Sequence, residues 1–226
     1  MNERIIISLG GSIIFPDAID TEFLAAFKKM ILEYIEKGTT FVLITGGGKI
    51  CRRYQDALKE LREVTTTDLD WMGIANTRTN AMLIKLLFKE LAHDEIILDP
   101  KNAAGISSPI IIGAGWKPGW STDYDAVEMA VATGAKKLIN LSNIDYVYTA
   151  DPRTNPDAEK IEKTSWAEYR ALIPTEWTSG LNAPFDPIAS KDAEEHGITV
   201  AIMNGKNLEN LKNYLDGKEF QGTVIS

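Results

Sequence analysis

The sequence of 226 residues has few cysteines, few histidines and no long apolar run. Cys51 is the only cysteine, so no internal disulfide can form and a reducing compartment is expected. No stretch approaches the roughly 18 apolar residues of a membrane span, and no signal peptide is recognised. We therefore expect a soluble, cytoplasmic protein without a membrane partner. The formal net charge of −8 excludes the broad basic face that a nucleic-acid polymer requires.

Short apolar runs alternate with segments of helical periodicity, which is typical of a parallel α/β sheet. The length fits one domain over residues 1–226. We predict a three-layer α/β/α sandwich around a mostly parallel central sheet. The expected strands are 5–7, 41–44, 96–98, 109–113, 138–142, 199–203 and 222–225, with an added hairpin strand at 145–150. The expected helices are 20–37, 49–63, 71–91, 123–132, 186–196 and 207–216.

Two glycine turns follow the first two strands. Gly46, Gly47 and Gly48 precede Lys49 and Arg52, and a Gly-Gly-Ser turn at residues 10–12 follows the first strand. Glycine lets the backbone approach an anion closely, and free N–H groups at a helix start attract phosphate. The pattern is neither a Walker A loop nor a dinucleotide fingerprint. Two such turns on neighbouring strands indicate two phosphate groups in one cleft, as in a phosphoryl transferase.

Two later segments carry weaker patterns. Residues 113–123 form a glycine-rich loop that contains Trp116 and Trp120 and ends in Ser-Thr-Asp, which is also a common helix cap. Residues 141–152 hold tyrosines and carboxylates after a strand, which by themselves indicate only a turn. Both segments gain meaning only together with the glycine turns.

Taken in order, these segments resemble the amino-acid kinase superfamily, and within it the archaeal type of uridylate (UMP) kinase. The resemblance spans nearly the whole chain. It rests on residues 10–12, 46–49 with Arg52 and Tyr54, 70–74, 77–83, 121–123, 147–152, 155–156, 186–187 and 222–225. The ordered set is specific, whereas each glycine turn alone is not.

The resemblance implies the reaction ATP + UMP → ADP + UDP, with Mg²⁺ accompanying ATP and no residue assigned as a metal ligand. Asp123 would orient the phosphate cleft, while Lys49 and Arg52 would supply positive charge. The implied ATP contacts are Gly10, Gly11, Ser12, Gly48, Arg52, Ser142, Asn143, Tyr148 and Asp151. The implied UMP contacts are Gly47, Asp70, Trp116, Lys117, Pro118, Gly119, Trp120, Ser121 and Thr122. The resemblance also implies a homo-oligomer, specifically a hexamer.

Three positions depart from the family pattern. Ser8 stands where many relatives carry a lysine, so one cation of the family site is either missing or supplied elsewhere. Lys49 is the first candidate to replace it, and Lys191 is a weaker one. Tyr146 replaces the usual glycine near the ATP pocket. Trp120 and Ser121 replace the usual histidine and threonine, which concerns the acceptor pocket.

These departures leave two alternatives open. The first is another small-molecule kinase of the same fold, with an acyl, carbamate or isoprenoid phosphate acceptor. The histidine typical of isoprenoid phosphate kinases is missing from the glycine loops, because the only histidines are His93 and His196. The second alternative is a non-catalytic nucleotide-binding or storage protein.

Overall fold

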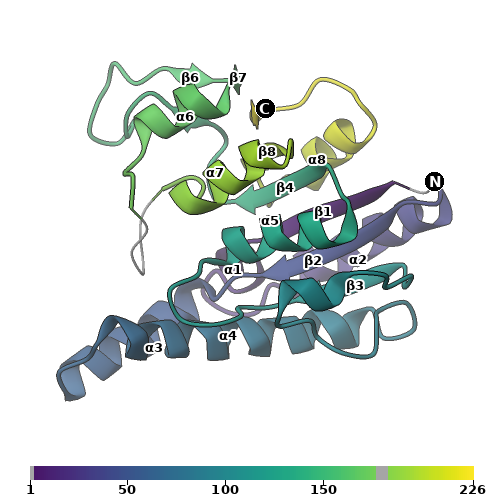
Figure 1. Cartoon of the computed structure of the whole chain (residues 1–226), viewed down its shortest axis with the longest axis horizontal. Coiled ribbons are helices and arrows are strands. Elements are labelled where there is room, and N and C mark those ends of the chain that lie inside the picture. The colour runs from purple at the N-terminus through teal and green to yellow at the C-terminus, as the bar shows by residue number, and fades with distance from the viewer. Residues whose placement is uncertain (1–2, 177–182) are drawn as a thin grey trace.

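The computed structural model describes residues 3–176 and 183–226, which form a seven-stranded sheet and a separate two-stranded one (Figure 1). In spatial order the large sheet contains β3 (Ile110–Gly113), β2 (Thr40–Thr45), β1 (Arg4–Leu9), β4 (Lys137–Ser142), β8 (Thr199–Asn204), β9 (Thr223–Ile225) and β7 (Lys163–Thr164). The five strands from β3 to β8 in this order are parallel, β9 runs antiparallel to β8, and β7 runs parallel to β9. The carboxyl ends of these parallel strands therefore share one edge of the sheet.

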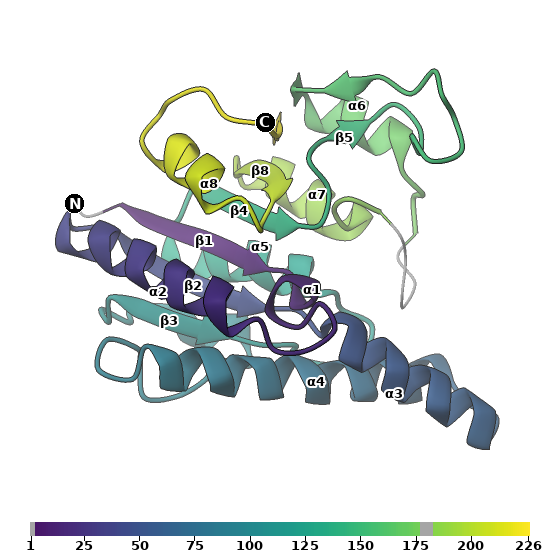
Figure 2. The ribbon, with the colours of Figure 1, turned by 180° about the vertical axis from the view of Figure 1, so that it is seen from behind.

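Helices cover both faces of this sheet, as Figures 1 and 2 show from opposite sides. One face packs against α2 (Thr21–Glu36), α4 (Thr66–Leu87) and α8 (Leu208–Leu215). The other packs against α5 (Thr122–Thr133), α6 (Trp166–Leu172) and α7 (Pro187–Glu195). Strand β1 shows the alternation that creates two cores, because Ile5 and Ile7 face the first layer and Ile6 the second. The predicted three-layer α/β/α architecture is confirmed.

Two further helices begin at the carboxyl edge of the sheet. Helix α1 (Gly11–Ile14) follows β1 directly, and α3 (Gly48–Leu61) follows β2. Helix α3 extends away from the body of the molecule beside α4 (Figure 2). A 3₁₀ helix, η1 (Pro100–Ala103), precedes β3.

Local sequence signals explain most element boundaries. The Asp20 side chain accepts a hydrogen bond from the N–H of Phe23 and starts α2. Thr65 and Asp68 form a capping box that starts α4 before the predicted residue 71. Gly134, in the left-handed region at φ 72°, ends α5.

Some predicted elements were wrong or missed. The predicted strand at 96–98 is not a strand: Ile97 makes a single isolated bridge to Gly113. The predicted hairpin strand is reduced to β5 (Val147–Tyr148), which pairs with the unpredicted β6 (Lys160–Ile161). Helix α6 was also missed. Across the described residues, no helix has the length and apolarity needed to span a membrane.

Candidate active site

The two predicted glycine turns lie in direct contact at the carboxyl edge of the sheet. The N–H of Gly46 donates to the carbonyl of Leu9 at 3.0 Å, joining the ends of β2 and β1. A Cβ atom added to Gly11 would lie 2.2 Å from the nitrogen of Gly48. Gly48 itself has φ 76°, a conformation that glycine tolerates and other residues rarely adopt. Both turns need glycine because their backbones touch.

The side chains around these turns divide into two pairs. Arg52 Nη2 donates to Ser12 Oγ at 3.2 Å, so the predicted phosphate residues of α3 and α1 meet. Lys49 Nζ instead pairs with Asp17 Oδ1 at 3.0 Å, in the loop after α1. Both partners of this ion pair are largely exposed. Lys191, the second substitute cation, lies on α7 and pairs with Glu195 at 3.8 Å.

Asp123 lies in the first turn of α5. The family resemblance implies a lysine beside this carboxyl group, but its neighbours here are neutral donors and the carboxyl-bearing residue Asp186. The N–H of Asp186 donates to it at 3.3 Å, and Ser8 Oγ and Asn140 Nδ2 each lie 3.5 Å away. Among the described residues, no lysine or arginine nitrogen comes within 4.0 Å of Asp123. Burial and the nearby charge of Asp186 raise the pKa of Asp123 to about 7.

Two more carboxyls join this cluster, and the sequence had not marked either as a site residue. Asp186 caps α7 by accepting the N–H groups of Ile188 and Ala189, although burial raises its pKa. Asp125 is fully buried, and burial raises its pKa to about 8. A carboxylate in the first turn of a helix usually indicates only a favourable helix-dipole interaction, so the sequence gave no sign of Asp125's burial.

The predicted UMP contacts from Trp116 to Ser121 lie in the loop that joins β3 to α5, and Thr122 is the first residue of α5. Gly119 N–H donates to Asp70 Oδ2 at 2.9 Å, which brings the predicted ribose-binding residue of α4 to this loop. Ser121 caps α5 by accepting from the N–H of Tyr124. The rings of Trp116 and Trp120 have centroids 5.9 Å apart, and Lys117 Nζ lies 3.9 Å from the Trp116 ring centre. Pro118 lies between Lys117 and Gly119 in the same loop.

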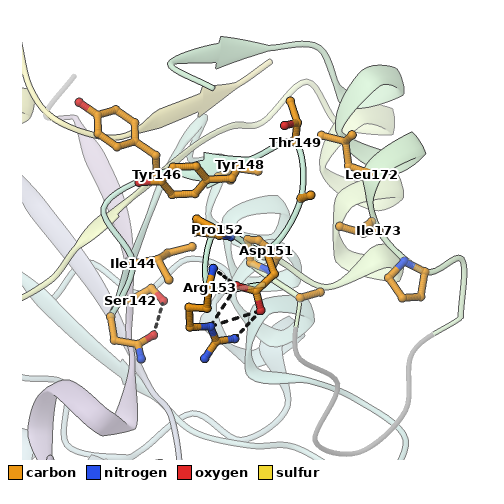
Figure 3. A pocket seen from close by; sticks show the side chains of 16 residues that line it. Ser142, Ile144, Tyr146, Tyr148, Thr149, Asp151, Pro152, Arg153, Leu172 and Ile173 are labelled. Atoms are coloured by element: carbon orange, nitrogen blue, oxygen red, sulfur yellow. Dashed lines mark hydrogen bonds and ion pairs between the residues drawn. The ribbon is translucent and has the colours of Figure 1, made fainter. Parts of the chain in front are cut away.

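The four predicted nucleoside contacts at the end of β4 and in the segment after it line one cavity of about 470 Å³ (Figure 3). They are Ser142, Asn143, Tyr148 and Asp151. The volume lies in the range of small-ligand pockets. Figure 3 shows Asp151 in contact with Arg153, whose hydrogen bonds lower the pKa of Asp151 to about 2. Tyr146, one of the departures from the family pattern, also lines this cavity.

The described residues contain no group of three or more histidine, cysteine or acidic side chains arranged to hold a metal ion. Mg²⁺ usually keeps several water ligands and binds phosphate oxygens together with one or two carboxylates. The hydrogen bond between Asp123 and Asp186 joins the Asp123 carboxyl group to the backbone N–H of Asp186, so it does not place the two carboxyl groups together as a pair of metal ligands.

Comparison with known proteins gives a consistent result over the full chain. A family model described as "Amino acid kinase family" matches residues 3–204. A uridylate kinase of Pyrococcus abyssi is 31% identical, covering 98% of this chain and 99% of the relative. One from Thermoplasma volcanium is 34% identical, covering 100% and 98%. The predicted resemblance to archaeal uridylate kinases is thereby confirmed.

Solved structures agree. The crystal structure of uridylate kinase from Archaeoglobus fulgidus superposes with a TM-score of 0.83 at 30% identity, covering 98% of this chain and 99% of that one. A UMP kinase from Ureaplasma parvum, 22% identical with a TM-score of 0.79, shares the fold. On this evidence, the chain belongs to the amino acid kinase family.

Proposed function

We propose that this protein is a UMP kinase that transfers the γ-phosphoryl group of ATP to UMP, giving ADP and UDP. The observation that carries the proposal is the meeting of two glycine turns, where a Cβ on Gly11 would lie 2.2 Å from the nitrogen of Gly48. Two phosphate-binding turns in contact suit a reaction that joins two phosphates. The full-length similarity to uridylate kinases supports UMP as the acceptor.

The donor nucleotide lies between the cavity after β4 and the turn after β1. Its nucleoside occupies the cavity lined by Ser142, Asn143, Tyr148 and Asp151. Asp151 is ionised at neutral pH, since Arg153 lowers its pKa, and suits the ribose hydroxyls as an acceptor. The phosphates then reach Gly10, Gly11, Ser12, Gly48 and Arg52.

The acceptor nucleotide lies on the other side of the glycine turns. Its phosphate meets Gly47 and the N-terminus of α3, where the helix dipole favours an anion. Its sugar and base lie against Asp70 and the loop from Trp116 to Thr122, which the Asp70–Gly119 hydrogen bond keeps together.

The transfer itself needs positioning and neutralisation of charge. A UMP phosphate oxygen attacks the γ-phosphorus of ATP and forms the new P–O bond, while the bond to the β–γ bridging oxygen breaks and ADP leaves. No strong base is required, because the attacking phosphate is already ionised. Lys49, Arg52 and the glycine amides stabilise the equatorial oxygens. Mg²⁺, entering with ATP, would supply further positive charge to the phosphates.

Around this reaction we place the coarser features of the protein. The whole chain acts as one kinase domain, since both cores share one sheet. It works in the cytoplasm as a homo-oligomer, with the hexamer as our specific expectation.

A coupled assay of ADP release with ATP, Mg²⁺ and a panel of acceptors tests this function. The panel contains UMP, CMP, dTMP, GMP and carbamate. Turnover selective for UMP is the expected result. Turnover with another acceptor would assign a different kinase of the same fold. ATP binding without turnover on any acceptor would assign a non-catalytic nucleotide-binding protein.

A further inference from the structure

The loop of residues 115–122, called the acceptor loop below, is tied to its surroundings through its backbone. Gly115 N–H donates to Thr77 Oγ1 at 3.0 Å, and Gly119 N–H donates to Asp70 Oδ2 at 2.9 Å. Both acceptors lie on α4, seven residues and therefore two helical turns apart. One face of α4 thus runs beneath the loop.

Arg78 adds the only charged donor from α4 to this loop among the described residues. Its Nη2 donates to the carbonyl of Trp116 at 3.0 Å, and its Nε lies 3.4 Å from the carbonyl of Gly115. The side chain is partly buried, and no carboxylate oxygen of the described residues lies within 4.0 Å of it. Hydrogen bonds from a charged donor are stronger than those between neutral groups.

The Trp116 backbone is therefore held from two elements at once. Its carbonyl accepts from Arg78 on α4, and its N–H donates to the buried Asp125 of α5 at 3.2 Å. Trp116 begins an aromatic group that continues through Trp120 to Tyr124. The ring centroids of Trp120 and Tyr124 lie 4.0 Å apart. Fixing both sides of Trp116 fixes the start of this group.

The same helix also holds the phosphate-binding turn. Asn80 Nδ2 donates to the carbonyl of Gly46 at 2.7 Å, and Thr45 Oγ1 donates to the carbonyl of Thr77 at 2.9 Å. Asn80 lies two residues after Arg78, so side chains from nearby positions of α4, pointing in different directions, reach the glycine turn and the acceptor loop. The helix sets the distance between the two.

We infer that Arg78 is a positioning residue for the acceptor nucleotide, because it fixes the acceptor loop at Trp116 relative to the glycine turn. This inference rests on the proposed function and extends it to a residue outside the predicted contacts. Arg78 acts through the loop backbone, so its loss affects the acceptor more than the donor.

The test compares Arg78→Met, which keeps length but removes the donors, with Arg78→Lys, which keeps the charge. Lys85→Met, in the last turn of the same helix, is the matched control. We expect Arg78→Met to raise the KM for UMP about tenfold or more, since hydrogen bonds to a charged group are lost. The KM for ATP should stay within about twofold. Arg78→Lys should recover part of the loss, and Lys85→Met should match the wild type.

Hydrogen–deuterium exchange without nucleotide provides a second readout that does not depend on activity. Arg78→Met should exchange faster across residues 115–120 and unchanged across residues 46–48. Equal exchange in variant and wild type would overturn the inference, as would KM values for ATP and UMP that rise together. If the wild type fails to phosphorylate UMP, the proposed function fails, and the exchange result alone then decides whether Arg78 fixes the loop.

Discussion

The hydroxyl of Ser8 lies 3.5 Å from Oδ1 of Asp123, at the edge of hydrogen-bonding distance. The family resemblance places a lysine at position 8, where it would meet this carboxylate as a cation. Here Asp123 is surrounded by a hydroxyl, an amide and the backbone of Asp186. In the proposed mechanism, the cation that neutralises the transferred phosphoryl group therefore comes from another element, and we assign that role to Lys49 and Arg52 of α3.

The first prediction concerns this replacement. Lys49→Ala should lower kcat about a hundredfold, because an aligned charge at the transferred group is lost. Arg53→Ala is the matched control, since Arg53 follows closely on α3 and lies 3.9 Å from the same Asp17. Steady-state rates at saturating ATP and UMP measure the effect. A Lys49→Ala enzyme as fast as Arg53→Ala would remove Lys49 from the mechanism.

Asp17 pairs with Lys49, so in the proposed mechanism it would compete with a phosphate for this cation. The pair is 3.0 Å long and largely exposed, so it is weak. Asp17→Asn should therefore free Lys49 and lower the KM for ATP by about threefold. Titration calorimetry with a non-hydrolysable ATP analogue compares the binding affinities of Asp17→Asn and the wild type. Weaker binding in Asp17→Asn would show that Asp17 supports the site.

The buried carboxyl of Asp125 predicts how stability depends on pH. Its pKa is raised from 3.8 to about 8, so the folded state holds a proton that the unfolded state releases. Asp125 therefore contributes stability at low pH that is lost as pH rises from about 4 to about 8. Asp125→Asn, which keeps an oxygen for the Trp116 N–H, should remove part of this fall.

Thermal unfolding at pH 5 and pH 8 measures the difference. Between pH 5 and pH 8, the free energy of unfolding should fall less in Asp125→Asn than in the wild type, by on the order of 2 kcal/mol. Asp123 and Asp186, whose pKa values are also raised, leave a smaller slope in the variant. An Asp125→Asn curve parallel to that of the wild type would show that Asp125 is ionised in the folded protein.

Because the two glycine turns are in contact, we expect a single methyl group added at Gly11 to reduce activity. In Gly11→Ala the new Cβ meets the backbone nitrogen of Gly48 at 2.2 Å, so the turns must separate. We expect a stability loss of about 1–3 kcal/mol and a fall in kcat of about a hundredfold. Gly134→Ala is the control, because its strain at φ 72° lies in an open position at the end of α5. It should cost similar stability, about 1–2 kcal/mol, with unchanged kcat.

Much of the fold could be predicted because its strands are buried apolar runs. The segments around Ile6 and Val42 have no polar alternation, which is typical of parallel strands covered on both faces. The segment at Ile97 has the same composition but makes one bridge only, and composition cannot separate these cases. Helix α6 did carry a usable signal, the capping box of Ser165 and Glu168.

The candidate site was predictable where its residues are close in sequence. One turn after β2 contains the residues from Gly46 to Lys49. One cavity is lined by Ser142, Asn143, Tyr148 and Asp151, which lie within ten residues of the sequence. The carboxyl cluster was not, because Asp123 and Asp186 meet across 63 residues. The Lys49–Asp17 and Arg78–Trp116 contacts are likewise long-range, and nothing local in the sequence marks them.

The most direct test of the account follows the phosphoryl group itself. ATP carrying radioactive phosphorus in its γ-phosphoryl group is incubated with the protein, Mg²⁺ and UMP, and the nucleotides are separated by chromatography. We expect the label to appear in UDP, at a rate that depends on both substrates. Label found only in inorganic phosphate, or only in ATP, would contradict the assignment of this protein as a UMP kinase.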